Sequence, residues 1–355
     1  MEPYVAVGLS STVWGVRKRE EIRKNLEHIR ELVAAATWLS SLDLPVKLIA
    51  IPEGALQGFT DEVFDMDHTE YARTIAIDIP GEETDFLGEI AKQYDCYVIA
   101  QAKARDERFP DRFFNNAFII NPKGKIILRH YKNSPLFPVE HSICPHDIYD
   151  EWIKLHGRNL QAFFPVVDTE IGKLGCALAN EGSYPEYIRG LAMNGAEVVY
   201  RPSYPHPHTQ NEFWEIQNRA RALDNNLYIV APNTGTYYLT VDSPVPIDTF
   251  GGKSMIVDYK GRIIGKHEYG AGSSYCAGVI DIEALRDFRA RSPWANWMKD
   301  LRTEIIQIIY ERELYPKNLW LDKKPYKHEE YRKKVIEPQI EKMFQLGIWT
   351  KPSKR

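Results

Sequence analysis

Two segments that lie far apart in this chain echo each other, and this echo constrains the fold more than any other feature. The first is FIINPKGKIILRHY, residues 118–131, and the second is MIVDYKGRIIGKHEY, residues 255–269. Each places a Lys-Gly turn between two apolar runs, which is typical of a β-hairpin. A matched hairpin in each half of the chain predicts two similar half-domains packed together.

Around these hairpins, apolar runs of strand length alternate with amphipathic segments of helix length. Residues 46–53 predict a buried strand that ends in an acid. The clearest helix is predicted over residues 18–41. Its apolar face holds Ile22, Leu26, Ile29, Leu32 and Val33. Strands alternating with helices predict an α/β domain whose sheets are covered.

The composition changes near residue 284. We therefore expect one large main domain over residues 1–285 and a C-terminal arm over residues 286–355. The arm is charged and punctuated by prolines, so it cannot build a core of its own. We expect it to wrap the main domain or a neighbouring subunit.

Charge and composition exclude several classes of protein. The net charge is −4 and 26% of residues are charged, so no basic field suggests nucleic acid or a membrane surface. No apolar run is long enough to span a bilayer, and the start MEPYVAVGLS lacks the pattern of a secretory signal. A reducing, cytoplasmic setting is expected.

Metal-ligand spacing is also missing from the sequence. The cysteines form no CxxC pair, which argues against zinc and against a disulfide framework. They are Cys96, Cys144, Cys176 and Cys276. The pair His206 and His208 has no acid or cysteine beside it, so we interpret it as part of a loop rather than as a metal site.

Three positions stand at the ends of predicted strands. Glu53 ends a strand in LIAIPEGALQGF, Lys132 ends the first hairpin in RHYKNSPLFPVEH, and Ala179 ends a strand in LGCALANEGSYPE. Folds of this class place their sites at the carboxyl ends of strands. The third position resembles the turn where many hydrolases hold a nucleophile, yet alanine has no reactive atom.

These segments, in this order, resemble the three signature segments of the nitrilase or carbon–nitrogen hydrolase superfamily. The resemblance covers roughly residues 4–285 and is closest to the aliphatic amidase and formamidase branch. It rests on PE…QG at residues 52–58, on K-x-x-P-x-x-P-x-E from Lys132 to Glu140, and on G-x-Y-P-E from Gly182 to Glu186.

The resemblance implies a four-layer α-β-β-α sandwich of two similar halves with a C-terminal extension. It also implies an amidohydrolase that cleaves a non-peptide C–N bond of a small amide through a Glu–Lys–Cys triad and a thioester. Glu53 maps to the general base, Lys132 to the lysine and Glu140 to a supporting glutamate, while the cysteine maps to Ala179. No metal or organic cofactor is implied, and relatives suggest a homodimer or a larger homo-oligomer.

Such chemistry needs these groups for physical reasons. A thiolate attacks the amide carbonyl, and a glutamate with raised proton affinity takes the thiol proton and later delivers it to the leaving amine. The lysine ammonium and the backbone N–H of Asn180 are expected to hold the oxyanion. Glu140 is expected to position the substrate's amino group or to keep Lys132 charged.

No other side chain replaces the missing nucleophile well. Cys176 lies three residues upstream on the same strand, and an odd separation turns it to the opposite face of the sheet. Cys144 is expected at the edge of the pocket without a catalytic role. Ser183 and Ser203 lack a partnered histidine that the sequence can show.

Three further residues are expected to shape the pocket. The branch commonly has an aromatic residue after the base glutamate, and Gly54 in its place predicts room for a larger acyl group. Tyr204 and Trp214 lie in or beside RPSYPHPHTQNEFW and either line the entrance or pack a loop or a subunit contact.

Three functional hypotheses stay open at this point. The chain is an amidohydrolase whose cysteine was replaced, a naturally non-catalytic binding or regulatory relative, or an enzyme that uses another nucleophile or a water directed by Glu53. A nitrilase or a carbamoylase using the same site is a further alternative. Retention of Glu53, Lys132 and Glu140 favours the first, because buried acids and amines are costly to desolvate.

Overall fold

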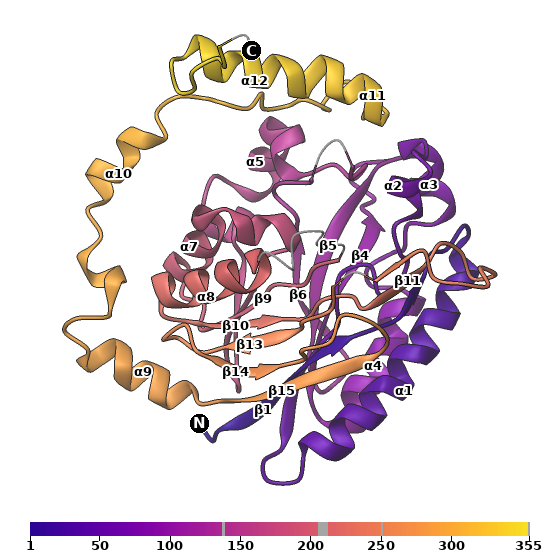
Figure 1. Ribbon diagram of the computed structural model, residues 1–355, viewed down its shortest axis with the longest axis vertical. Helices are drawn as coiled ribbons and strands as arrows, with labels where there is room; N and C mark the ends of the chain where they lie inside the picture. The colour runs from indigo at the N-terminus through magenta and orange to yellow at the C-terminus, as the bar shows by residue number, and fades with distance from the viewer. Residues whose placement is uncertain (137–138, 205–211, 250, 354–355) are drawn as a thin grey trace.

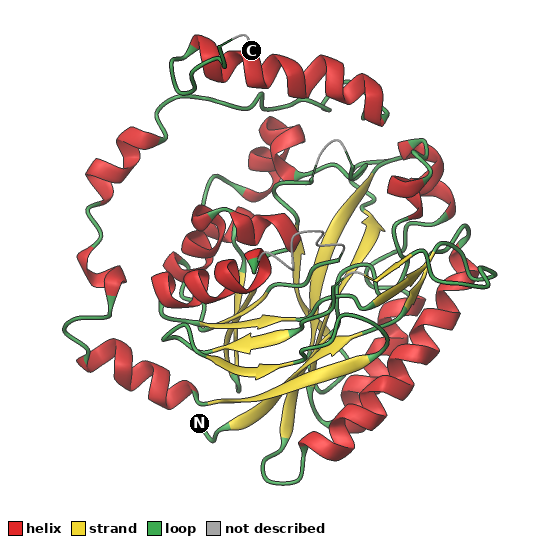
Figure 2. Ribbon diagram, viewed as in Figure 1, coloured by secondary structure: helices red, strands yellow, loops and turns green. Residues whose placement is uncertain are grey.

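The computed structural model describes residues 1–136, 139–204, 212–249 and 251–353. Two six-stranded sheets pack against each other, and helices cover their outer faces (Figure 1, Figure 2). The predicted four-layer α-β-β-α sandwich is therefore confirmed. Within the described segments, no helix is both long and apolar enough to cross a membrane.

The first sheet has the strand order β15-β1-β3-β4-β5-β6 and the second has the order β14-β13-β10-β9-β8-β7. The strands of the first sheet are β1 (Tyr4–Ser10), β3 (Val46–Ala50), β4 (Tyr97–Arg105), β5 (Phe113–Ile120), β6 (Ile126–Tyr131) and β15 (Ser274–Ile280). Those of the second are β7 (Val166–Thr169), β8 (Gly172–Cys176), β9 (Val198–Tyr200), β10 (Tyr228–Ala231), β13 (Met255–Val257) and β14 (Ile263–Lys266). A small sheet joins β2 (Val13–Trp14), β11 (Thr236–Tyr238) and β12 (Asp248–Thr249).

The two large sheets share one topology, as the sequence echo predicts. In the first, β1, β3 and β4 run parallel and the hairpin β5–β6 is added antiparallel. In the second, β8, β9 and β10 run parallel and the hairpin β13–β14 follows. The parallel crossovers pass through α1 (Ile22–Ser40) and α4 (Glu82–Tyr94) in one half, and through α7 (Pro185–Met193) and α8 (Phe213–Asn225) in the other.

The two hairpins turn in the same way. Gly124 and Gly261 have φ angles of +72° and +74°, a conformation that glycine adopts without steric cost. In each turn the glycine N–H donates to the carbonyl oxygen three residues earlier, that of Asn121 or Asp258, at 2.8 Å. The Lys-Gly dipeptide that marks the echo therefore encodes one turn geometry twice.

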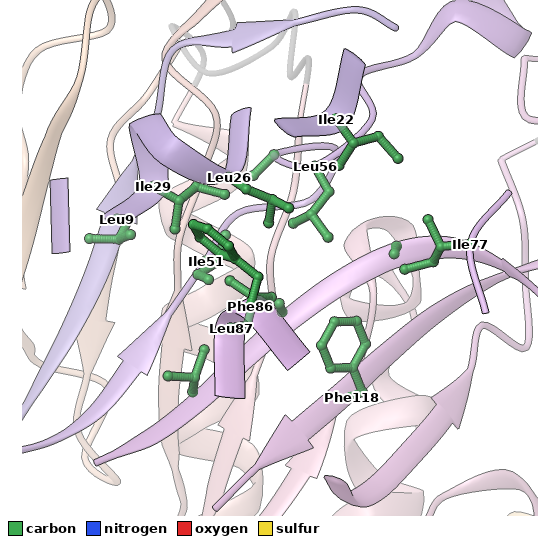
Figure 3. Close-up of a cluster of buried hydrophobic side chains, with 14 of the residues drawn as sticks. Leu9, Ile22, Leu26, Ile29, Ile51, Leu56, Ile77, Phe86, Leu87 and Phe118 are labelled. Carbon is green, nitrogen blue, oxygen red and sulfur yellow. The ribbon is translucent and has the colours of Figure 1, made fainter. Parts of the chain in front are cut away.

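The core divides into layers that match the sandwich. Ile22, Leu26 and Ile29 of α1 and Leu87 of α4 fill the space against the first sheet (Figure 3). Side chains of both sheets, among them Leu48 and Leu174, fill the space between the sheets. A third cluster fills the space under α7 and α8. Each fully buried aliphatic side chain contributes roughly 1.5–3 kcal/mol, so these layers fix where the strands end.

Short helices complete the main body. They are α2 (Thr60–Val63), α3 (His68–Thr74), α5 (Tyr149–His156) and α6 (Leu160–Phe163). Of these, α2, α3 and α5 lie along the upper part of the main body in Figure 1. The arm then carries α9 (Ile282–Arg291), α10 (Thr303–Ile309), α11 (His328–Tyr331) and α12 (Glu337–Gln345). The predicted division at residue 285 falls inside α9, whose Ile282 and Leu285 pack between the sheets.

The arm wraps its own main body. It runs around one side of the sandwich and returns above α5 (Figure 1). Residues 292–319 include no buried side chain, whereas Trp320, Tyr331 and Val335 are buried against the end of the first sheet. Their partners there include Phe114 and Trp152. The last part of the arm is therefore anchored by an apolar cluster of its own.

Candidate active site

Glu53, Lys132 and Ala179 each follow the carboxyl end of a strand. Glu53 lies three residues after β3, Lys132 directly after β6, and Ala179 three residues after β8, where it opens a 3₁₀ turn over Ala179–Ser183. The first two belong to one sheet and the third to the other. Glu53 and Lys132 are each only 1% exposed.

Lys132 is the centre of a buried ion-pair network. Its Nζ lies 2.7 Å from Oε2 of Glu140 and 3.2 Å from Oε1 of Glu53. All three side chains are almost completely buried, so their charges interact strongly and each depends on the others. The structure thus brings together three residues that lie up to 87 positions apart in the sequence.

Asn115 of β5 joins the two carboxylates and was missed by the sequence analysis. Its Nδ2 donates to Oε1 of Glu53 at 2.9 Å and to Oε1 of Glu140 at 2.8 Å. Asn115 is itself oriented by Gln101, whose Nε2 donates to its Oδ1 at 2.7 Å. Its position in an ordinary apolar-looking strand gave no signal, although two adjacent asparagines inside a buried run are unusual.

The two glutamates differ in how many of their carboxylate oxygens accept hydrogen bonds. Both oxygens of Glu140 accept hydrogen bonds, with Ser142 Oγ at 2.6 Å and the Leu136 N–H at 3.1 Å completing the set. In Glu53 only Oε1 is satisfied, and the buried Oε2 has no hydrogen-bond partner among the described residues. A buried, unpaired carboxylate oxygen is costly, and it is the atom free to exchange a proton with a ligand.

Burial and charge shift the pKa values of the two carboxyl groups in opposite directions. Burial raises the pKa of Glu53, and the neighbouring Glu140 raises it further, although Lys132 opposes both effects. For Glu140 the lysine charges outweigh burial and lower its pKa to about 2. Burial alone would lower the pKa of Lys132, but the two carboxylates outweigh it and raise this pKa. Two nearby acids with divergent proton affinities are typical of acid–base sites.

Ala179 is held in a strained backbone conformation. Its φ is +44°, in the left-handed region that residues with a Cβ seldom adopt, and its side chain is 7% exposed. Its N–H donates to the carbonyl oxygen of Pro202 at 2.9 Å. Strain of this kind, where glycine would be easier, is concentrated at functional turns between a strand and a helix.

Glu181 ties this turn to Lys132 and was also missed by the sequence analysis. Its Oε1 accepts the N–H of Asn133, the residue after Lys132, at 2.7 Å. Its Oε2 accepts the N–H of Leu178, the residue before Ala179, at 2.6 Å. One buried carboxylate therefore holds the ends of β6 and β8 together, and with them the lysine and the turn.

A second buried ion-pair network is centred on Lys103. Nζ of Lys103 is 2.5 Å from Asp61 and 2.8 Å from Glu62, and all three side chains are buried. Burial raises the pKa of Glu62 to about 7. The hydroxyl of Tyr204 donates to Glu62, and its ring stacks on Phe59 with the centroids 3.5 Å apart. Tyr204 is thus a buried member of this second network.

The space beside Gly54 is filled by another side chain, so this glycine does not itself widen the acyl site. A Cβ on Gly54 would lie 2.0 Å from the ring of Phe59. The φ of Gly54 is +75°, and its N–H donates to Oε1 of Gln101 at 2.7 Å. Glycine serves a tight turn here, and Phe59 supplies the ring that the neighbouring residue lacks.

Trp214 does not line an entrance. It is 1% exposed within the apolar cluster between the second sheet and its helices, and its Nε1 donates to the carbonyl of Lys253 at 3.1 Å. The packing interpretation therefore holds for this residue. His206 and His208 lie outside the described residues.

The other candidate nucleophiles are placed as expected. Cys176 is buried between the sheets, and burial raises its pKa. Burial also raises the pKa of Cys144 well above its ordinary value. The hydroxyls of Ser183 and Ser203 donate to Gln217 and to the Tyr204 carbonyl, and neither bonds a histidine among the residues that the structure describes. A thiol with a raised pKa is a poor nucleophile.

A cavity of about 340 Å³ opens beside the ion-pair network. It adjoins the network through Leu136, whose N–H binds Glu140, and through Asn180, which follows Ala179. Its wall also contains Tyr184 and Tyr187 of the main body and Tyr315 of the arm. The arm therefore supplies part of the wall of the space next to the site, and Cys144 lies at its edge as predicted.

Comparison with known proteins decides the family. The sequence profile of the carbon–nitrogen hydrolases matches residues 6–290, which is most of the chain. The chain belongs to the carbon–nitrogen hydrolase family. Its fold agrees with that of family members: a carbon–nitrogen hydrolase from Helicobacter pylori G27 superposes with a TM-score of 0.66 at 19% identity, covering 87% of this chain and 99% of that one.

Other relatives carry more specific names. A formamidase of Bacillus cereus (strain AH820) is 30% identical over 226 residues, or 62% of this chain and 59% of the formamidase. The match thus spans less than two thirds of that relative. A cysteine-to-alanine mutant of the amidase from Nesterenkonia sp. AN1, in complex with butyramide, superposes with a TM-score of 0.62 at 16% identity, covering 86% of this chain and 96% of that one.

Proposed function

We propose that this carbon–nitrogen hydrolase binds a small amide at the Glu53–Lys132–Glu140 network and, with alanine at position 179, does not hydrolyse it through a thioester. The observation that carries the proposal is the unpaired Oε2 of Glu53, whose other carboxylate oxygen pairs with Lys132. The carboxylate of Glu181 joins the residue after Lys132 to the strained turn at Ala179. The proposal is supported by the close contacts among Glu53, Lys132 and Glu140 in one buried network. The formamidase similarity supports an amide as the ligand.

The roles follow from these contacts. With cysteine at position 179, Oε2 of Glu53 would take the thiol proton as sulfur attacks the amide carbonyl. The ammonium of Lys132 and the N–H of Asn180 would stabilise the negative oxygen. Glu53 would then deliver its proton to the departing amine and accept one from the water that cleaves the thioester. Glu140 holds Lys132 in place through its 2.7 Å ion pair.

The adjoining cavity supports a larger amide as the ligand. Its volume of about 340 Å³ exceeds the space that formamide or acetamide needs, and its wall is rich in tyrosine. We therefore propose an amide with a larger or aromatic substituent that extends past Asn180. A preference of the Ala179→Cys protein for formamide and acetamide alone would contradict this assignment.

The test is mass spectrometry of the Ala179→Cys protein mixed with a panel of amides. A mass increase equal to one acyl group, located on residue 179, is the expected result. Because loss of a nucleophile costs roughly 10⁶-fold in kcat in comparable triads, amide turnover should rise from background to a measurable rate. The Ala179→Cys/Glu53→Gln double variant is the control, and it should form no adduct.

The alternatives give different outcomes in the same assay. Turnover by the chain as it stands would favour attack by a water that Glu53 activates, since Oε2 of Glu53 is free to hold one. Ligand binding without any adduct in Ala179→Cys would favour a non-catalytic binding or regulatory protein. A preference for nitriles or carbamoyl compounds would reassign the substrate within the family.

We also propose that the chain forms a homodimer or a larger homo-oligomer. Ile305, Ile308 and Ile309 of α10 expose 64–67% of their surface. This part of the arm lies beside α7, because Tyr310 bonds Glu186. An exposed apolar face of this kind marks an interaction site. Light scattering should give a multiple of 41.0 kDa for the wild type, and a monomer for Ile305→Lys/Ile308→Lys.

A further inference from the structure

Three potential metal ligands meet where the arm touches the main body. Asp65 lies between α2 and α3, His141 follows Glu140 in the chain, and His328 begins α11. Nε2 of His141 is 3.1 Å and Nε2 of His328 is 3.8 Å from Oδ1 of Asp65. One ligand atom from each of the three residues lies within 4.8 Å of the others.

His141 supplies an independent sign of a ligand. Its side chain is 3% exposed, and its buried Nε2 has no hydrogen-bond partner in the described part of the chain. The atom thus faces Asp65 at 3.1 Å without forming a proper hydrogen bond, which leaves a buried polar group unsatisfied. Asp65 and His328 expose 36% and 32% of their side chains, so an ion can enter from solvent.

We propose that Asp65, His141 and His328 bind a divalent transition-metal cation of the Zn²⁺ type, which fastens the arm to the loop that carries Glu140. Two imidazoles and a carboxylate are a preferred donor set for such ions, with the remaining position open to water. Tetrahedral bonds of about 2.0–2.1 Å place ligand atoms roughly 3.3–3.4 Å apart, a value between the 3.1 and 3.8 Å that separate Asp65 Oδ1 from the two histidine Nε2 atoms.

The site adds a polar link between the arm and the main body, beside the apolar cluster of Trp320, Tyr331 and Val335. In the absence of an ion, the His328 N–H donates to Asp65 Oδ1 at 3.1 Å and His328 Nε2 lies 2.9 Å from the Val139 carbonyl. Coordination of an ion by Nε2 would replace the second contact. Tyr331, three residues later, lines the cavity beside the site. A bound metal would therefore hold the cavity wall in place.

The experiment uses the full chain, stripped with a chelator and titrated with Zn²⁺ against a chromophoric competitor. His328→Gln and Asp65→Asn remove one donor each. His28→Gln is the matched control, because His28 is also partly exposed and lies outside the cluster. Co²⁺ in place of Zn²⁺ reports the coordination geometry by its absorption spectrum. Trypsin cleavage after Lys323 and Lys327 reports whether the arm is fastened.

The expected result is one equivalent of Zn²⁺ for the wild type and for His28→Gln, at least ~10-fold weaker binding for both donor variants, and slower cleavage of the arm with Zn²⁺. Absence of stoichiometric binding, or equal affinity in His328→Gln and the wild type, would overturn the proposal. Neither result depends on amide turnover, so the metal site and the proposed function fail separately.

Discussion

Replacing Lys132 by methionine tests whether the buried ion pairs hold the site together. Methionine keeps most of the length of the side chain and removes its charge. At an effective dielectric constant of 20, the 2.7 Å contact with Glu140 corresponds to about 6 kcal/mol and the 3.2 Å contact with Glu53 to about 5 kcal/mol. Proton uptake by Glu53 offsets part of this loss. We expect the free energy of unfolding to fall by roughly 3–5 kcal/mol.

The assay is urea unfolding followed by tryptophan fluorescence, with Lys92→Met as the matched control. Lys92 forms an ion pair of the same 2.7 Å length with Glu89, but both partners are about half exposed or more. Exposed pairs contribute about 0–1 kcal/mol, so the control should lose little. Adding Glu140→Gln to Lys132→Met should recover part of the loss, because the uncompensated buried charge is removed.

The result that refutes this reasoning is a loss in Lys132→Met as small as that in Lys92→Met. The buried network would then contribute no more than a surface pair. A double variant less stable than Lys132→Met would show that the hydrogen bonds of Glu140, rather than its charge, stabilise the loop.

Three further predictions test the same site and the arm. Burial raises the pKa of Glu53 above its ordinary 4.5, so the stability that protonated Glu53 contributes is complete below that pH and is lost as the pH rises through the folded-state pKa. The free energy of unfolding of Glu53→Gln, measured from about pH 4 to pH 8, should therefore rise relative to that of the wild type as the pH increases. Ala179→Gly relieves the positive φ and should raise the unfolding free energy by ~0.5–1 kcal/mol in thermal melts; a loss would mean that the turn is not strained. Trp320→Ala empties the centre of the arm cluster and should cost ~3–5 kcal/mol of local stability, seen as faster proteolysis of residues 312–336 than of the main body.

The sequence by itself determined the architecture of this protein. The period of apolar residues along residues 18–41 appears as the buried face of α1, and the repeated Lys-Gly turn appears as two hairpins with the same hydrogen bonds. Such features are local, because side-chain period and turn conformation depend on residues a few positions apart. The strand ends that carry Glu53, Lys132 and Ala179 could be predicted for the same reason.

Only the tertiary structure decided which distant residues bind these side chains. Asn115, Glu181 and the partners of His141 act across contacts between strands or segments distant in sequence, and no local pattern encodes which distant group a side chain will meet. Packing of neighbouring elements also decided what two sequence positions do. Phe59 takes the space next to Gly54, and Trp214 packs in a core rather than at an entrance, because neighbouring elements fill volume that a motif leaves open.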